Sequence, residues 1–201
     1  MHHCPVPRSP RDDAPGAIQH AIARSSGGES IARDEQDRTE LLSRIGIAIE
    51  RHRWSCLAYC LMSTHFHLVV GTPAPNLGVG MQWLLASYAR YFNKRHEREG
   101  NLFHSRFYSR RIRSEEHLIS AMVYVLLNPV RAGVVERPEH WRWSSYMATV
   151  GTEYAPHFLD TRAALELIDV HPRSAQRRLE LAVYEARARD HARAAGVRHR
   201  V

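Results

Sequence analysis

Two histidines separated by a single residue, His65 and His67, are the first side chains here whose types and spacing could do chemistry. They lie in the run LMSTHFHLVV (residues 61–70), whose β-branched end and strand-forming flank predict a buried strand. Side chains alternate along a strand, so both imidazoles face one side, about 6–7 Å apart. Two imidazoles at that spacing can share one divalent ion. The same pattern also fits two surface histidines on a half-exposed strand.

A tyrosine and an asparagine form a second candidate pair. Ser114 is a good cap for a helix that we expect to run to about Leu127, because Pro129 disfavours helical conformation at the residue before it. At about 100° per residue, Tyr124 and Asn128 lie roughly opposite the apolar arc of this helix. That arc is formed by Leu118, Ile119, Met122, Val123 and Leu126. The pair could present a hydroxyl and an amide; a surface tyrosine before a helix-ending asparagine is the alternative.

The charge balance favours an anionic partner. The chain has 201 residues and a formal net charge of +7, and Lys94 is the only lysine among its 28 basic residues. Arginine offers a planar fork that suits phosphate, so this balance favours nucleic acid. Codon usage in a GC-rich genome produces the same excess of arginine over lysine. The net charge therefore supports a nucleic-acid partner, whereas the ratio of arginine to lysine does not.

Arginines alternate with aromatic residues in LFHSRFYSRRIR, residues 102–113, which we predict to be a strand. This pattern suits a single strand of nucleic acid, with guanidinium groups on phosphates and rings under bases. An ordinary basic edge strand is the alternative. Our candidate DNA contacts are these residues and one arginine at the end of the preceding helix: Arg95, Arg106, Tyr108, Arg110, Arg111 and Arg113.

The predicted elements follow the order strand–helix–strand–strand–helix–strand, with one more helix after them. This order matches an α+β fold with a ferredoxin-like antiparallel sheet and helices on one face. We divide the chain into a flexible arm (residues 1–14), a main domain (residues 15–150) and a basic helical tail (residues 151–201). The tail is expected to form helices over residues 158–170 and 174–195. The second helix could grip DNA or simply be solvated.

The remaining features bear on the compartment. The three cysteines, Cys4, Cys56 and Cys60, form no CxxC pair and indicate reduced thiols in a cytoplasmic protein. No apolar run approaches 18 residues, so we expect no membrane span. The first residues lack the apolar core of a signal peptide.

Several motifs together resemble a known family. The runs PGAIQHAIAR, LMSTHFHLVV, SYARYFNKRH, GNLFHSRFY, YVLLNPVRAGVV and RPEHWRWSSY occur in this order over roughly residues 15–150. They resemble the REP-associated tyrosine transposases, which are relatives of the insertion-sequence transposases in the HUH nuclease superfamily. The chain departs from the commoner family pattern in two places. It has Ser63–Thr64 where Pro-Asn is usual, and Ser-Ser-Gly-Gly after the first strand where Arg-Gly-Asn is usual.

The resemblance implies roles for the residues above. His65 and His67 would bind a divalent ion, Mg²⁺ or Mn²⁺, with Asn128 completing the metal site and Tyr124 acting as the nucleophile. The implied activity is metal-dependent cleavage and rejoining of single-stranded or hairpin DNA through a 5′-phosphotyrosine. Two alternatives stay open: a DNA-binding protein that keeps the fold without cleaving, and a hydrolase of small phosphoesters. The sequence also leaves open whether the chain acts as a monomer or a homodimer.

Overall fold

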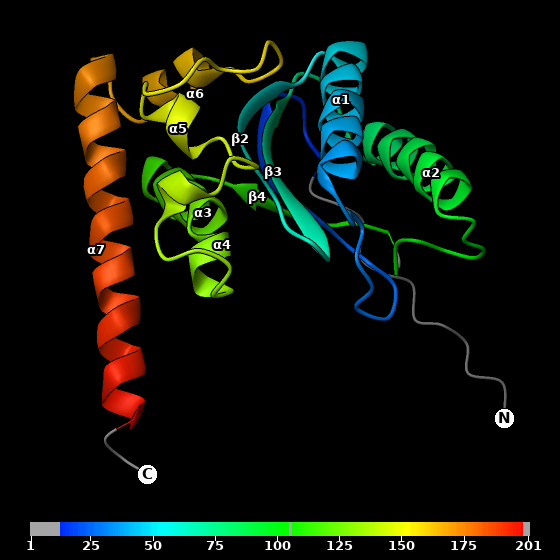
Figure 1. The fold of residues 1–201 in the computed structure, drawn as a ribbon. Coiled ribbons are helices and arrows are strands. Elements are labelled where there is room, and N and C mark those ends of the chain that lie inside the picture. The colour runs from blue at the N-terminus through cyan, green and yellow to red at the C-terminus, as the bar shows by residue number, and fades with distance from the viewer. Residues whose placement is uncertain (1–12, 105, 199–201) are drawn as a thin grey trace, which may run out of the picture.

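The computed structural model describes residues 13–104 and 106–198 (Figure 1). All but the last two residues of the predicted N-terminal arm, residues 1–14, lie outside this range. Within it, a central sheet has helices on both faces, and the long C-terminal helix forms the outermost layer on one side (Figure 1).

The sheet has four strands in the order β2-β3-β1-β4, and every neighbouring pair is antiparallel. Its strands are β1 (Ala17–Arg24), β2 (Ser55–Leu61), β3 (His65–Thr72) and β4 (Tyr108–Ile112). This is the strand order of a ferredoxin-like fold, so the predicted fold class is confirmed. The central strand β1 pairs with β3 on one side and β4 on the other, which places the HxH strand next to β1.

Two helices cover one face of the sheet, as predicted: α1 (Glu35–His52) and α2 (Leu77–Arg95). The Asp34 side chain caps α1 by accepting a hydrogen bond from the backbone N–H of Asp37 at 3.0 Å. Phe66 points from β3 into the apolar core between this helix pair and the sheet, where Leu84 and Tyr88 are also fully buried.

The opposite face carries a second layer of helices. Helix α3 (Glu115–Leu126), capped by Ser114 as predicted, packs over β2 and β3. Helix α7 (Pro172–Arg198) packs against α3 from outside, and α6 (Thr161–Glu166) packs against β2 and α7 (Figure 1). The shorter elements on this side are η1 (Pro138–His140) and α5 (Tyr146–Thr149).

The predicted bounds of the last strand are wrong. Strand β4 is shorter than residues 102–113, because the residues before Tyr108 leave the sheet; Phe103 makes only an isolated bridge to Ser25. The helix expected to run to about Leu127 does end there: α3 stops at Leu126, and Asn128 begins a separate turn, α4 (Asn128–Arg131). Pro129 fits the first turn of a helix because its missing N–H would have no partner there.

The tail is packed against the domain. Backbone contacts join Leu159 to Cys56 of β2. Helix α7 buries Ala175, Leu179 and Val183 in the same core as α3. The first half of α7 is therefore a structural element with one apolar face, while its outer face is solvated. The domain boundary at residue 150 stays a prediction.

Within the described ranges, no helix combines the length and apolar character needed to cross a membrane.

Candidate active site

Strand β3 presents His65 and His67 on the face that α3 covers, opposite Phe66. Their ring centroids are 5.0 Å apart. The Nε2 atom of His65 lies 3.1 Å from the Oδ1 atom of Asn128, and its Nδ1 atom lies 3.1 Å from the hydroxyl of Thr64. The two histidines therefore share one face of the strand, as predicted, and the side chain of Asn128 contacts His65 on that face.

His67 is fully buried, and only one of its two ring nitrogens has a hydrogen-bond partner among the described residues. Its Nδ1 atom lies 2.9 Å from the Nε2 atom of His20, which projects from the neighbouring strand β1. Its Nε2 atom is buried and has no hydrogen-bond partner among the described residues. A buried polar atom without a partner is costly, so the Nε2 atom of His67 is a candidate ligand atom.

The electrostatics keep this cluster neutral. Burial, with smaller contributions from His20 and His65, lowers the pKa of His67 to about 2. Burial also lowers the pKa of His20 to about 4, with a smaller contribution from His117. The pKa of His65 is lowered as well, mainly by burial, against the opposing hydrogen bond to Asn128. All three imidazoles are therefore neutral near pH 7, which is the form that binds metal ions.

Tyr124 reaches the histidines from α3. Its ring meets His67 edge-on at a centroid distance of 5.6 Å, and it meets His20 at 5.8 Å. The side chain is 39% exposed, so it lies at the mouth of the cluster. On another side, the guanidinium of Arg131 lies 5.5 Å from the ring centroid. Tyr124 thus stands between the buried imidazoles and solvent.

The donor set fits a divalent ion with open coordination positions. Three atoms can contribute: Nε2 of His65, Nε2 of His67 and Oδ1 of Asn128. In the part of the chain that the structure describes, no cluster of three or more His, Cys, Asp or Glu residues could hold a metal. Two imidazoles with one amide oxygen are too few to enclose an ion, unlike a structural zinc site. The unpaired Nε2 of His67 is the feature that most directly fits a bound metal.

Comparison with known proteins identifies the family. The family profile described as "Transposase IS200 like" matches residues 17–126, which is more than half of the chain. The chain belongs to the IS200-like transposase family.

Two related proteins are informative. A Haemophilus influenzae protein assigned as a REP-associated tyrosine transposase is 28% identical over 118 residues, covering 53% of this chain and 67% of the relative. The fold also matches a solved structure described as a REP-associated tyrosine transposase bound to a REP hairpin. That match has a TM-score of 0.61 at 15% identity and covers 77% of this chain and 94% of the other. At that identity, the structural match bears on the fold.

In this IS200-like transposase, a groove of about 540 Å³ lies beside the histidine cluster. Ile22 pairs with His67 on one side and with Tyr108 on the other, so these residues form a row across three strands. Adjacent strands lie about 4.8 Å apart, which places Tyr108 about 10 Å from His67. The groove is lined by Ile22, Arg24, Ser25, Gly27, Gly28, His104, Arg106 and Tyr108.

The predicted DNA-contacting residues lie in different parts of the structure. Arg106 and Tyr108 line the groove, and strand alternation puts Arg110 on the same face as Tyr108. Arg111 and Arg113 line a different hollow, at the start of α3.

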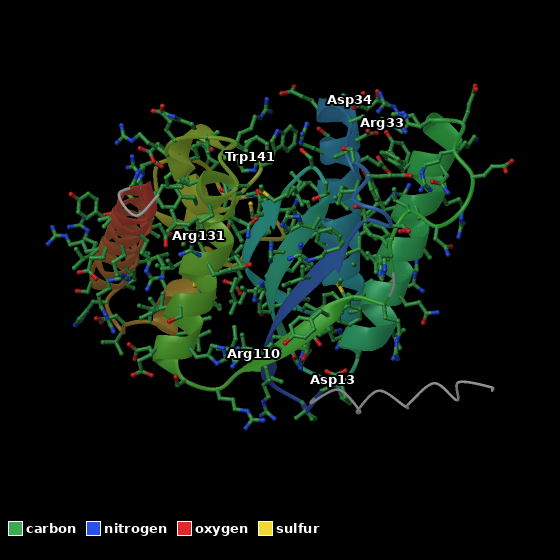
Figure 2. All side chains as sticks on the ribbon, turned by 90° about the horizontal axis from the view of Figure 1, so that it is seen from below. Asp13, Arg33, Asp34, Arg110, Arg131 and Trp141 are labelled. Carbon is green, nitrogen blue, oxygen red and sulfur yellow. The ribbon has the colours of Figure 1, made fainter. Side chains whose placement is uncertain are left out.

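Arg95 is not brought to the site. Its guanidinium pairs with Asp34 at 2.7 Å and with Asp37 at 2.5 Å. These partners belong to the α1 side of the sheet, and Figure 2 shows Asp34 and Arg131 on opposite sides of it. The predicted DNA contact at Arg95 therefore has no support from this geometry.

Sequence reasoning missed His20 and Arg131. His20 lies in the run PGAIQHAIAR, but only the register of β1 against β3 brings it to His67. Arg131 was visible in the run NPVRAG, yet nothing in that run indicated which side chain its guanidinium would contact.

Proposed function

We propose that this IS200-like transposase is a metal-dependent, single-strand-specific DNA endonuclease and strand-transferase. It cleaves and rejoins hairpin-containing DNA through Tyr124. One observation carries the proposal: the ring of Tyr124 packs against His67, a buried histidine whose Nε2 atom has no partner. A candidate nucleophile and an open ligand atom therefore share one small site.

The histidines are arranged to act as ligands. If Nε2 of His67 held the ion, its Nδ1–H would donate to Nε2 of His20, and this would fix the tautomer and the ring. If Nε2 of His65 also held the ion in place of its hydrogen bond to Asn128, its Nδ1–H would donate to the Thr64 hydroxyl in the same way. A bound Mg²⁺ or Mn²⁺ supplies Lewis-acid stabilisation of the charge that develops on the scissile phosphate.

Tyr124 performs the bond exchange. Its phenolic oxygen, once deprotonated, attacks the phosphorus, and the bond from phosphorus to the departing 3′ oxygen breaks. The products are a 5′-phosphotyrosine and a strand with a free 3′-OH. One ester bond replaces another, so the 3′-OH of a second strand can attack the phosphotyrosine and release Tyr124. No nucleotide cofactor is needed.

The groove provides a path for the strand. The ring of Tyr108 is 62% exposed and can stack beneath a base, while Arg24 and Arg106 are placed for backbone phosphates. Hairpin DNA is proposed as the substrate because the structural relative is described as bound to a REP hairpin.

The site is built from a single chain. Tyr124 lies against His67 of its own sheet, which supports cleavage in cis. A homodimer, which the sequence left open, is not required to bring these residues together.

The test is a covalent adduct. Hairpin DNA labelled at its 3′ end is incubated with the protein and Mn²⁺ and run on a denaturing gel, because Tyr124 should retain the 5′-phosphate side. We expect a slow-migrating labelled band from the wild type and from Tyr154→Phe, a control at a fully exposed tyrosine. Tyr124→Phe should give no band and should bind the hairpin as well as the wild type.

Two results would overturn the proposal. An adduct from Tyr124→Phe would place the nucleophile elsewhere. Hairpin binding without an adduct from the wild type would favour the non-cleaving DNA-binding protein.

A further inference from the structure

Arg131 links the nucleophile to the C-terminal helix. Its guanidinium carbon lies 5.5 Å from the ring centroid of Tyr124, within cation–π range. Its Nε–H donates to the Oδ2 atom of Asp190 on α7 at 2.8 Å. Figure 2 shows Arg131 on the side of the sheet where α3 and α7 lie. A chain of two contacts therefore joins α7 to Tyr124.

The side chain of Arg131 is not tightly packed. It lines a cavity of about 700 Å³ between α7 and the loop after α4, and its side chain is 32% exposed. Arg187 and His191 of α7 line the same cavity, as does Glu136 from the loop. Asp190 is the acid of α7 that pairs with Arg131 at this cavity. Without the Asp190 carboxylate, Arg131 would lose the ion pair that holds its guanidinium beside Tyr124.

The ring of Tyr124 is held from two directions. His67 and His20 contact it from the sheet, and Arg131 contacts it from α4. Because Tyr124 lies at the mouth of the site, the imidazoles alone leave it free to turn outward. A nucleophile must line up with the bond that breaks, and small errors of position reduce the rate strongly.

We propose that Arg131 is a positioning residue for Tyr124, and that Asp190 of α7 holds Arg131 in place. The C-terminal helix then has a part in the reaction without contacting DNA. This inference rests on the function proposed above.

The first test separates positioning from DNA binding. We expect Arg131→Gln to lower the initial rate of adduct formation by about 10- to 100-fold at saturating hairpin DNA, with little change in the Kd. Asp190→Ala should lower the rate less, and Arg131→Lys should recover part of it because the cation is kept. The control is Glu185→Ala, which removes an acid of the same helix that pairs with Arg189.

A charge swap separates positioning from simple stabilisation. The double variant Arg131→Asp with Asp190→Arg can restore the ion pair but leaves no cation at position 131. We expect it to recover the melting temperature lost by the single variants, while the rate stays low. A rate that recovers together with the melting temperature would overturn the proposal.

A spectroscopic measurement makes the test independent of activity. With 3-fluorotyrosine incorporated, the ¹⁹F resonance of Tyr124 is assigned by its loss in Tyr124→Phe. Arg131→Gln and Asp190→Ala should both shift this resonance, and Glu185→Ala should leave it unchanged. If the wild type forms an adduct, an unchanged rate in Arg131→Gln overturns the proposal. If the wild type forms none, the proposed function has failed, and the resonance alone decides whether Arg131 positions the ring.

Discussion

One fully buried polar residue on each face of the sheet, Asp37 and His67, can be compared directly. On the α1 and α2 side, Asp37 is fully buried and accepts hydrogen bonds or ion pairs from Arg95, His96 and the backbone N–H of Arg33. On the α3 side, His67 is equally buried, but one of its nitrogens has no partner among the described residues. The carboxylate of Asp37 is thus paired within the protein, and we call its group the closed cluster. Nε2 of His67 is left for a ligand, and we call the histidine group the open cluster.

Tyr88 and Tyr124, one on each face, also differ in burial. Tyr88 is fully buried on the α1 side, and its hydroxyl donates to the backbone carbonyl of Ile31 at 2.5 Å. Burial, with a smaller contribution from Asp37, raises the pKa of Tyr88 far above its usual range. Tyr124 is 39% exposed beside the histidines. Residue type alone therefore does not mark the candidate active face; the meeting of an accessible tyrosine, two histidines and an asparagine amide does.

The largest effect is expected from breaking the open cluster. His65→Ala should lower adduct formation by more than about 100-fold. Even residues that only hydrogen-bond to a metal ligand typically cost about 10- to 100-fold in metal affinity or activity when they are mutated. EDTA should do the same to the wild type, and calorimetry should show weaker Mn²⁺ binding by the variant. The melting temperature should change little, because His65 is only partly buried.

The control is His157→Ala, which removes an exposed histidine that pairs with Glu50. Full cleavage in EDTA, or in His65→Ala, would exclude the metal role.

The next effect is expected from breaking the closed cluster. Asp37→Ala should reduce the free energy of unfolding by about 3 kcal/mol, the lower end for removing one partner of a buried ion pair. The lower end applies because Arg95 keeps its pairing with Asp34. Urea denaturation measures this loss, and adduct formation by the folded variant should match the wild type.

Glu40→Ala is the matched control, since it removes an acid of the same helix from a more exposed pair with Arg44. It should cost less than about 1 kcal/mol. An Asp37→Ala variant that is fully stable but unable to cleave would reverse the assignment of the two faces.

The smallest effect is expected from a charge at the rim of the closed cluster. The hydrogen bond from Arg95, followed by the one from the backbone N–H of Asp37, lowers the pKa of Asp34 from 3.8 to about 2. The folded state therefore favours the carboxylate, so this stabilisation is complete above pH 3.8 and is lost as the pH falls towards 2. Asp34→Asn keeps a good helix cap but removes the charge.

We expect Asp34→Asn to be slightly less stable than the wild type at pH 7, and we expect the difference to shrink between pH 4 and pH 3. Urea denaturation over this range measures it. A difference that stays constant down to pH 3 would mean that the charge of Asp34 does not contribute.

The sequence by itself determined the local features. Strand alternation places His65 and His67 on one face, and the caps at Asp34 and Ser114 depend on residues within one helical turn. The order of the elements was enough for the fold class. The spacing of Tyr124 and Asn128, read with the family motifs, picked out two residues that do lie at the histidines.

Tertiary structure decided what depends on pairing between distant segments. The register of β1 against β3 brings His20 to His67, and the packing of α7 on α3 brings Asp190 to Arg131. Arg95 ends α2 on the opposite face of the sheet, where it pairs with acids that are about 60 residues earlier in the chain. A local pattern records which way a side chain points from its own element. It does not show which other element that side chain will contact, because the packing of the elements depends on how all their apolar faces are buried together.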